Sequence, residues 1–189
     1  MRAFVIAMES EAAAIRPRLC ADDRLYVSGI GKALAAAATM KAICDGATEI
    51  WNVGLSGGFG PKVEIGGVYE VARAVEWDFD LDAINGKGRG VKDGRESPYV
   101  EISPTGLTLA TGDRFADDPA EEALVESFGA ELRDMEGAAI AEVCRAEGVP
   151  LKMYKCVCDI KGRGSMTGQY ASLRDRCLAG LDEFLQSNA

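Results

Sequence analysis

Carboxylate side chains follow three separate apolar runs of this sequence, at the point where each run ends. Glu9 and Glu11 come after RAFVIAM, Asp134 and Glu136 follow a shorter run, and Asp159 closes LKMYKCVCD. In an open α/β sheet, ligands bind in the crevice beyond the carboxyl ends of the strands. Two carboxyl groups in different surroundings can divide acid and base work, because burial raises the pKa of one while the other stays ionised. The spacing therefore indicates acid–base chemistry at one edge of a sheet.

The other reactive residue types of the sequence indicate that acid–base chemistry must be carried out by carboxylates. The chain has no histidine, which excludes Ser-His and Cys-His nucleophile systems. The cysteines lack CxxC spacing, so we expect no metal site, and we expect no cofactor. Cys156 and Cys158 alternate along a predicted strand and should face one side of the sheet as buried, reduced side chains. The six cysteines are Cys20, Cys44, Cys144, Cys156, Cys158 and Cys177.

Three glycine-rich or turn segments also lie where a ligand can bind. SGIGK, with Gly29 and Gly31, precedes a predicted helix and can cradle an anion or a hydroxyl, although it is not a P-loop. GLSGGFG brings backbone close to a strand end at Gly57, but its spacing is not that of a dinucleotide site. TGDRF places Phe115 after a strand-end turn, where an aromatic ring can stack on a base or simply join the core. Taken singly, each acid can equally be a helix cap or a turn residue.

The elements that would position these residues alternate along the chain. RAFVIAM, RLYVSGIGK, TEIWNVG and VYEVARAVEW are typical of strands, and SEAAAIRPRL, ALAAAATMKAIC and DDPAEEALVESFG are typical of helices. Pro17 should end or kink the first helix, and Pro119 should lie in the first turn of another. A last helix is expected from about residue 169 to 186, and the glycine-rich stretch 78–97 is expected to be a mobile loop. The alternation predicts one α/β domain over residues 1–189, with helices on both faces of a central sheet.

Length and charge exclude several classes of protein. The chain has 189 residues, enough for an ordinary core, and its net charge of −9 disfavours binding to nucleic acid. The first apolar run is too short for a signal sequence or a membrane span. We therefore expect a cytoplasmic protein that does not associate with membranes.

Six strings, in this order, resemble one superfamily: AMESEAAAI, SGIGKALAAAAT, NVGLSGGF, TGDRF, DMEGAAIAEVC and VCD. The chain is similar to the purine nucleoside phosphorylases and nucleosidases, and most of all to the 5′-methylthioadenosine/S-adenosylhomocysteine nucleosidases. The resemblance implies a three-layer αβα sandwich around a central mixed β-sheet, a homodimer, and a small-molecule nucleoside substrate. It also implies hydrolysis of the N-glycosidic bond of a 5′-modified adenine nucleoside, which yields free adenine and a ribose product in methionine salvage.

The resemblance also assigns roles to particular residues. Glu11 matches the glutamate that activates water, and Asp159 matches the general acid that protonates the purine. Glu136 matches the acid that holds the ribose hydroxyls. The remaining residues implied to contact substrate are Met8, Ile30, Gly57, Phe115, Ala116, Asp134 and Met135, with Met135 beside the sugar, Phe115 stacked on the base, Ile30 near the 5′ substituent and Asp134 in a flanking position.

The sequence favours water over phosphate as the nucleophile. Asn52 and Leu55 stand where the phosphorylases of this superfamily resemble one another in having arginine and serine, and Glu11 would repel phosphate at short range. Arg114, Ala116 and Cys158 also depart from the usual pattern. Three alternatives stay open: another purine nucleoside such as futalosine, phosphorolysis through an unfamiliar phosphate site, and a non-catalytic nucleoside-binding protein.

Overall fold

The computed structural model describes residues 1–115 and 118–188. Within this part of the chain, one mixed sheet of eight strands runs in the order β2-β1-β3-β7-β6-β4-β5, and β8 pairs with both β3 and β4. The double pairing of β8 closes β3, β7, β6, β4 and β8 into a ring. The strands are β1 (Arg2–Ile6), β2 (Arg24–Val27), β3 (Glu49–Gly58), β4 (Val68–Glu76), β5 (Tyr99–Glu101), β6 (Leu107–Thr111), β7 (Leu132–Asp134) and β8 (Leu151–Ile160).

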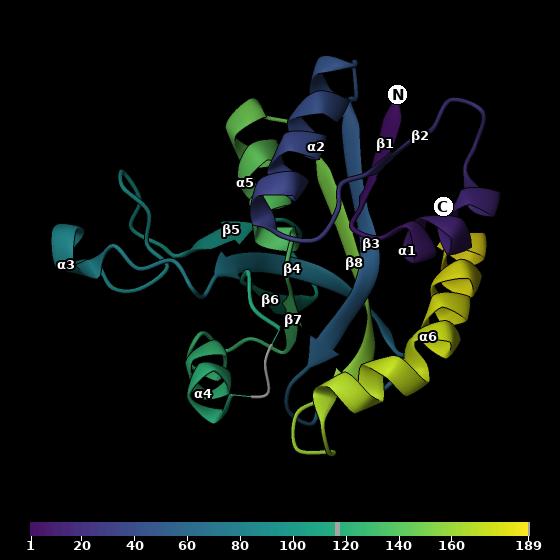
Figure 1. Cartoon of the computed structure of the whole chain (residues 1–189). Coiled ribbons are helices and arrows are strands. Elements are labelled where there is room, and N and C mark those ends of the chain that lie inside the picture. The colour runs from purple at the N-terminus through teal and green to yellow at the C-terminus, as the bar shows by residue number, and fades with distance from the viewer. Residues whose placement is uncertain (116–117, 189) are drawn as a thin grey trace.

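Helices cover the two faces of this sheet (Figure 1). On one face, α1 (Glu9–Ile15) and α6 (Met166–Asn188) pack their apolar side chains against β1, β3 and β8. On the other, α2 (Lys32–Cys44) and α5 (Gly137–Glu147) pack against β1 and β3. The short helix α4 (Pro119–Ser127) covers a separate cluster around Phe59 and Trp77. The predicted αβα arrangement is confirmed.

Local sequence signals explain where several helices begin and end. Helix α1 stops at Ile15, and Pro17 lies in a single 3₁₀ turn directly after it, because proline cannot continue the hydrogen-bonding pattern. Helix α4 begins with Pro119 in its first turn, and the Asp118 carboxylate accepts hydrogen bonds from the amides of the next residues. Cys156 and Cys158 belong to the same apolar cluster, as their alternation predicted.

The stretch 78–97 extends away from the body of the molecule and carries the one-turn helix α3 (Asp82–Asn85) (Figure 1). Ion pairs hold its base: Lys92 and Arg95 both pair with Glu142 on α5. Whether this stretch is mobile stays a prediction. None of the helices in the described residues combines the length and apolarity that crossing a membrane requires.

Candidate active site

A cavity of about 230 Å³ lies at the carboxyl ends of β1, β3, β7 and β8. Its lining unites segments that are far apart in the sequence, as expected for strands whose ends meet at one edge. Ala116 lies outside the described residues. The other predicted site residues all line the cavity: Met8, Glu11, Ile30, Gly57, Phe115, Asp134, Met135, Glu136 and Asp159.

Glu11 is held at this edge by backbone amides. The amide of Leu55 donates to Glu11 Oε1 at 2.8 Å, and the amide of Met8 donates to Oε2 at 3.1 Å. The side chain is 3% exposed. Burial raises the pKa of Glu11, although the Leu55 amide and the nearby Lys155 ammonium oppose the shift. A raised pKa makes this group a stronger base for accepting a proton.

Asp159 lies near the end of β8 and is 1% exposed. At this point β8 and β7 pair with opposite sides of β3. A Cβ atom at Gly57, its partner on β3, would lie only 2.8 Å from Asp159 Oδ1. Glycine is therefore required here so that the carboxyl group can lie over the strand. The Cys158 thiol lies 3.5 Å from Asp159 Oδ2 and 3.6 Å from the carbonyl oxygen of Ser56, and can donate to either. Burial, reinforced by the Asp159 carboxylate, raises the pKa of Cys158 and keeps it a neutral thiol.

A buried lysine, which the sequence analysis did not select, stands among the acids. Lys155 Nζ lies 2.8 Å from Asp134 Oδ2. Burial alone would lower the pKa of Lys155, but the carboxylates of Asp134, Glu136 and Glu11 outweigh it, so the pKa is raised and the ammonium stays charged. A lysine directly before the apolar run CVC, in a strand predicted to be buried, was the signal that could have revealed it.

Asp134 is more than a flanking residue. Its carboxylate accepts hydrogen bonds from the Thr111 hydroxyl at 2.6 Å and from the Gly137 amide at 2.8 Å, in addition to the Lys155 ion pair. These partners tie β6, β7, β8 and the start of α5 together. Asp134 therefore fixes the position of the segment that carries Met135 and Glu136.

Glu136 faces the cavity with an altered pKa. Its Oε1 accepts a hydrogen bond from the Gly31 amide at 2.8 Å, just before α2 begins. Burial, followed by repulsion from Asp134, raises the pKa of Glu136 to about 7, while Lys155 and the Gly31 amide oppose this shift. The Gly31 amide of the SGIGK turn thus binds a carboxylate of the protein itself, and binding of a ligand anion or hydroxyl by this turn stays a prediction.

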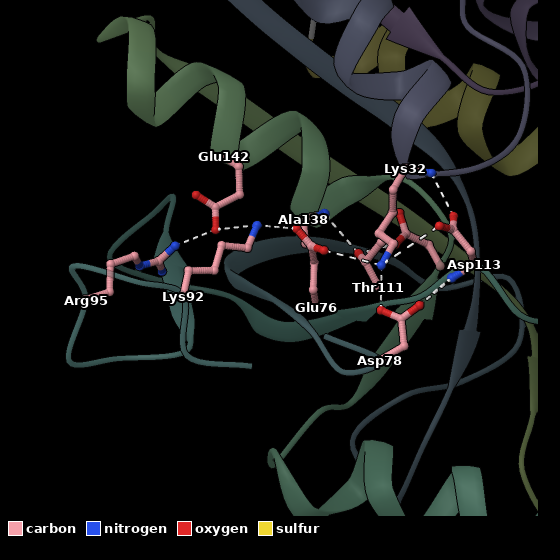
Figure 2. Close-up of polar contacts among 10 residues, drawn as sticks. Lys32, Glu76, Asp78, Lys92, Arg95, Thr111, Asp113, Ala138 and Glu142 are labelled. Atoms are coloured by element: carbon pink, nitrogen blue, oxygen red, sulfur yellow. Dashed lines mark hydrogen bonds and ion pairs between the residues drawn. The ribbon is translucent and has the colours of Figure 1, made fainter. Parts of the chain in front are cut away.

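An ion-pair network holds this turn in place (Figure 2). Lys32 Nζ lies 2.6 Å from Asp78 and 3.3 Å from Glu76, and the Lys32 amide donates to Asp113 at 2.8 Å. The amide of Asp113 in turn donates to Asp78 at 3.0 Å. These contacts connect the start of α2 to the segments that follow β4 and β6. They therefore support the Gly31 amide that contacts Glu136.

Aromatic rings and a second buried cation form the other part of the cavity. Phe115 meets Tyr170 of α6 edge-on, with ring centroids 6.0 Å apart. Arg133 is 5% exposed, and its Cζ lies 5.7 Å from the Phe115 ring centroid. Ser56 also lines the cavity, and its buried hydroxyl has no hydrogen-bond partner among the described residues. Arg133, Tyr170 and Ser56 could not be recognised as site residues in the sequence, because only the folded chain brings them to this edge.

Comparison with known proteins shows the family of this chain. Residues 96–177 match the family model of the Phosphorylase superfamily. The chain is 34% identical over 166 residues to the 5′-methylthioadenosine/S-adenosylhomocysteine nucleosidase of Geobacillus sp. (strain WCH70), covering 77% of this chain and 71% of that one. It is 31% identical to the enzyme of the same name from Geobacillus kaustophilus (strain HTA426), with 87% of each chain covered.

Among solved structures, the futalosine hydrolase of Helicobacter pylori strain 26695 has the same fold. The TM-score is 0.87 at 20% identity, over 98% of this chain and 95% of that one. The family-model match and the curated relatives show that this chain is a member of the phosphorylase superfamily. Within it, the chain belongs to the family of nucleosidases, as its sequence resemblance predicted.

Proposed function

We propose that this protein hydrolyses the N-glycosidic bond of a 5′-modified adenine nucleoside, 5′-methylthioadenosine or S-adenosylhomocysteine, to free adenine and the ribose product. The observation that carries the proposal is the presence of Glu11, Glu136 and Asp159 around one cavity. The activity in the names of the relatives supports the same reaction. With methylthioadenosine as substrate, the enzyme would serve methionine salvage.

The three carboxyl groups divide the reaction between them. Asp159 donates a proton to the purine as the bond to the sugar breaks, so that the base leaves neutral. Glu11 accepts a proton from the water that forms the new bond to the anomeric carbon. Glu136 accepts hydrogen bonds from the ribose hydroxyls. Met135 packs beside the sugar and Phe115 stacks on the base.

The charge of the site favours a cationic transition state. The carboxyl groups of Glu11, Asp134, Glu136 and Asp159 outnumber the two buried cations of the site, Lys155 and Arg133. Cleavage of an N-glycosidic bond builds positive charge on the ribose, and fixed negative charge in a water-poor site stabilises that state.

The same surplus of negative charge disfavours a phosphate nucleophile. Asn52 Nδ2 donates to the carbonyl oxygen of Val5 at 2.9 Å and does not line the cavity. Leu55 presents its amide to Glu11 and offers no side-chain donor. Water is therefore the nucleophile in this proposal.

Paired substitutions test the assignment of acid and base. We expect Asp159→Asn and Glu11→Gln each to lower kcat by roughly 10²–10⁴-fold, the usual contribution of a proton-transfer group. Substrate binding, measured by calorimetry, should be largely retained in Asp159→Asn, whereas Asp45→Asn, at an exposed site, serves as a control that keeps full activity. Unchanged turnover in Asp159→Asn would refute the mechanism, and binding without any turnover by the unaltered protein would favour a non-catalytic binding protein.

The active form in this proposal is a homodimer in the cytoplasm. Exposed apolar side chains extend from β2 along α2 (Val27, Ile30, Leu34 and Met40), and Ile30 also lines the cavity. A second copy covering this surface would bury it and narrow the mouth of the cavity. Light scattering should give twice the mass of the chain, and Leu34→Glu should shift it to the monomer; a monomeric unaltered protein would contradict the dimer.

A further inference from the structure

The hydroxyl group of Tyr170 contacts the residue that also holds Glu11. Tyr170 belongs to α6 and lines the cavity, and its ring packs edge-on against Phe115. Its O–H donates to Met8 Sδ at 3.5 Å, and the Met8 amide donates to Glu11 Oε2 at 3.1 Å. Met8 therefore brings the hydroxyl of Tyr170 and the carboxylate of Glu11 to the same side of the cavity.

The oxygen of this hydroxyl keeps its ability to accept hydrogen bonds. A phenolic hydroxyl has one proton to donate and also accepts, and here the proton points at a thioether sulfur, which is a weak acceptor. Within the part of the chain that the structure describes, this contact is the only hydrogen bond of the Tyr170 hydroxyl. Burial, and after it the Glu11 carboxylate, raises the pKa of Tyr170, so the group is neutral near pH 7. Its oxygen can therefore accept a hydrogen bond from a small molecule in the cavity.

The carboxylate of Glu11 also has acceptor positions left. Oε1 accepts one amide proton, from Leu55, and Oε2 accepts one, from Met8. An ionised carboxylate offers about four acceptor positions on its two oxygens, so each oxygen can accept one more hydrogen bond. A water molecule has two O–H donors and needs two acceptors to hold it in one orientation. When both protons are held, a lone pair of the water oxygen is free to attack a carbon atom.

We propose that Tyr170 orients the nucleophilic water, with its oxygen accepting one O–H of the water while Glu11 accepts the other. The water oxygen bonds to the anomeric carbon as the bond from that carbon to the base breaks, and the base takes its proton from Asp159. The water proton on the side of Glu11 moves to that carboxylate. The other proton stays on the oxygen, which becomes the anomeric hydroxyl of the product. The inference rests on the proposed function for the role of Glu11 as the base.

Tyr170→Phe tests this contact, because it removes one oxygen atom and keeps the ring that packs on Phe115. Release of adenine from 5′-methylthioadenosine by the full chain is measured in phosphate-free buffer. We expect kcat to fall about 3–10-fold, the effect of losing one neutral hydrogen bond, and KM to change by less than about twofold, because the bond is to water. Tyr26→Phe is the matched control: its hydroxyl donates to Asp45 at an exposed site, so kcat should be unchanged.

Methanol as a competing nucleophile distinguishes the loss of this contact from a general disturbance of the cavity. Methanol has one O–H, which Glu11 accepts, and its attack gives a methyl glycoside in place of the free sugar. Water alone has a second proton for Tyr170, so Tyr170→Phe should raise the ratio of methyl glycoside to free sugar about 3–10-fold.

The outcomes separate this inference from the proposed function. A kcat for Tyr170→Phe equal to that of Tyr26→Phe, or a product ratio that does not rise, would overturn the role of Tyr170 and leave the proposed hydrolysis in place. An unaltered protein that releases no adenine would overturn the proposed function and this inference with it.

Discussion

Replacing Lys155 with methionine should destabilise the protein strongly, because it removes the cation that pairs with Asp134 in a cluster of buried carboxylates. The Lys155 side chain is 3% exposed and that of Asp134 is 2% exposed. Removing one partner of such a buried pair costs about 3–5 kcal/mol, since the remaining charge is left without compensation. For a protein with a typical stability of about 5–15 kcal/mol, this is a large fraction of the free energy of unfolding.

The assay is urea unfolding followed by tryptophan fluorescence at pH 7.5, for Lys155→Met, Asp134→Asn and the double variant. The pKa of Lys155 is raised above 10.5 in the folded state, so its contribution is fully present below pH 10.5 and is lost only as the pH rises through the higher, folded value. Asp134→Asn should restore part of the stability lost in Lys155→Met, because it removes the charge left alone.

Lys41→Met is the matched control, because Lys41 pairs with Asp45 at an exposed site and its loss should change stability little. A Lys155→Met variant within about 1 kcal/mol of the unaltered protein would show that Lys155 does not compensate buried charge, since loss of one partner of a buried pair should cost several times more. A double variant no more stable than Lys155→Met would refute the coupling between the two residues.

Two other predictions concern the same cavity. Gly57→Ala should lower kcat at least about tenfold, because the new Cβ would lie 2.8 Å from Asp159 Oδ1 and displace the catalytic carboxyl group. Gly168→Ala is the control, because its nearest neighbouring atom would lie 3.8 Å away, and it should leave kcat unchanged. Equal kcat values in the two variants would contradict this prediction. The pKa of Glu136 is raised from 4.5 to about 7 in the folded protein, so the folded state binds this proton more tightly than the unfolded state does. This difference stabilises the folded state fully below pH 4.5, and the stabilisation is lost as the pH rises to 7. Glu136→Gln should therefore gain stability relative to the unaltered protein by on the order of 3 kcal/mol between pH 4.5 and 7.5, measured by urea unfolding, and a pH-independent difference would rule out the shift.

The acids of the site could be recognised from the sequence because the polarity of strands brings their ends together. Glu11, Glu136 and Asp159 each follow an apolar run, and parallel pairing places the ends of β1, β3 and β8 at one edge. The glycines could be recognised for a related reason. Gly57 and Gly31 stand where backbone approaches a carboxylate, Gly57 in the last residues of β3 and Gly31 in the turn before α2, and both belong to glycine-rich strings of the sequence.

The cations of the site could not be recognised in the same way. Lys155 lies within an apolar run, and its burial makes sense only once Asp134 is brought beside it by a different strand. In the sequence, Arg133 is one charged residue among several in the same stretch. Only the strand pairing with Gly57 shows that it lies opposite Asp159. Tyr170 belongs to helix α6, whose apolar periodicity predicts only that the helix packs against the sheet. That pattern does not indicate that Tyr170 lines the cavity.

Hydrolysis is tested most directly by incubating the purified protein with 5′-methylthioadenosine in phosphate-free buffer made with ¹⁸O-labelled water. We expect free adenine to be released without phosphate and one labelled oxygen to appear on the anomeric carbon of the ribose product. Adenine that forms only after phosphate is added, with a sugar phosphate as the second product, would contradict it.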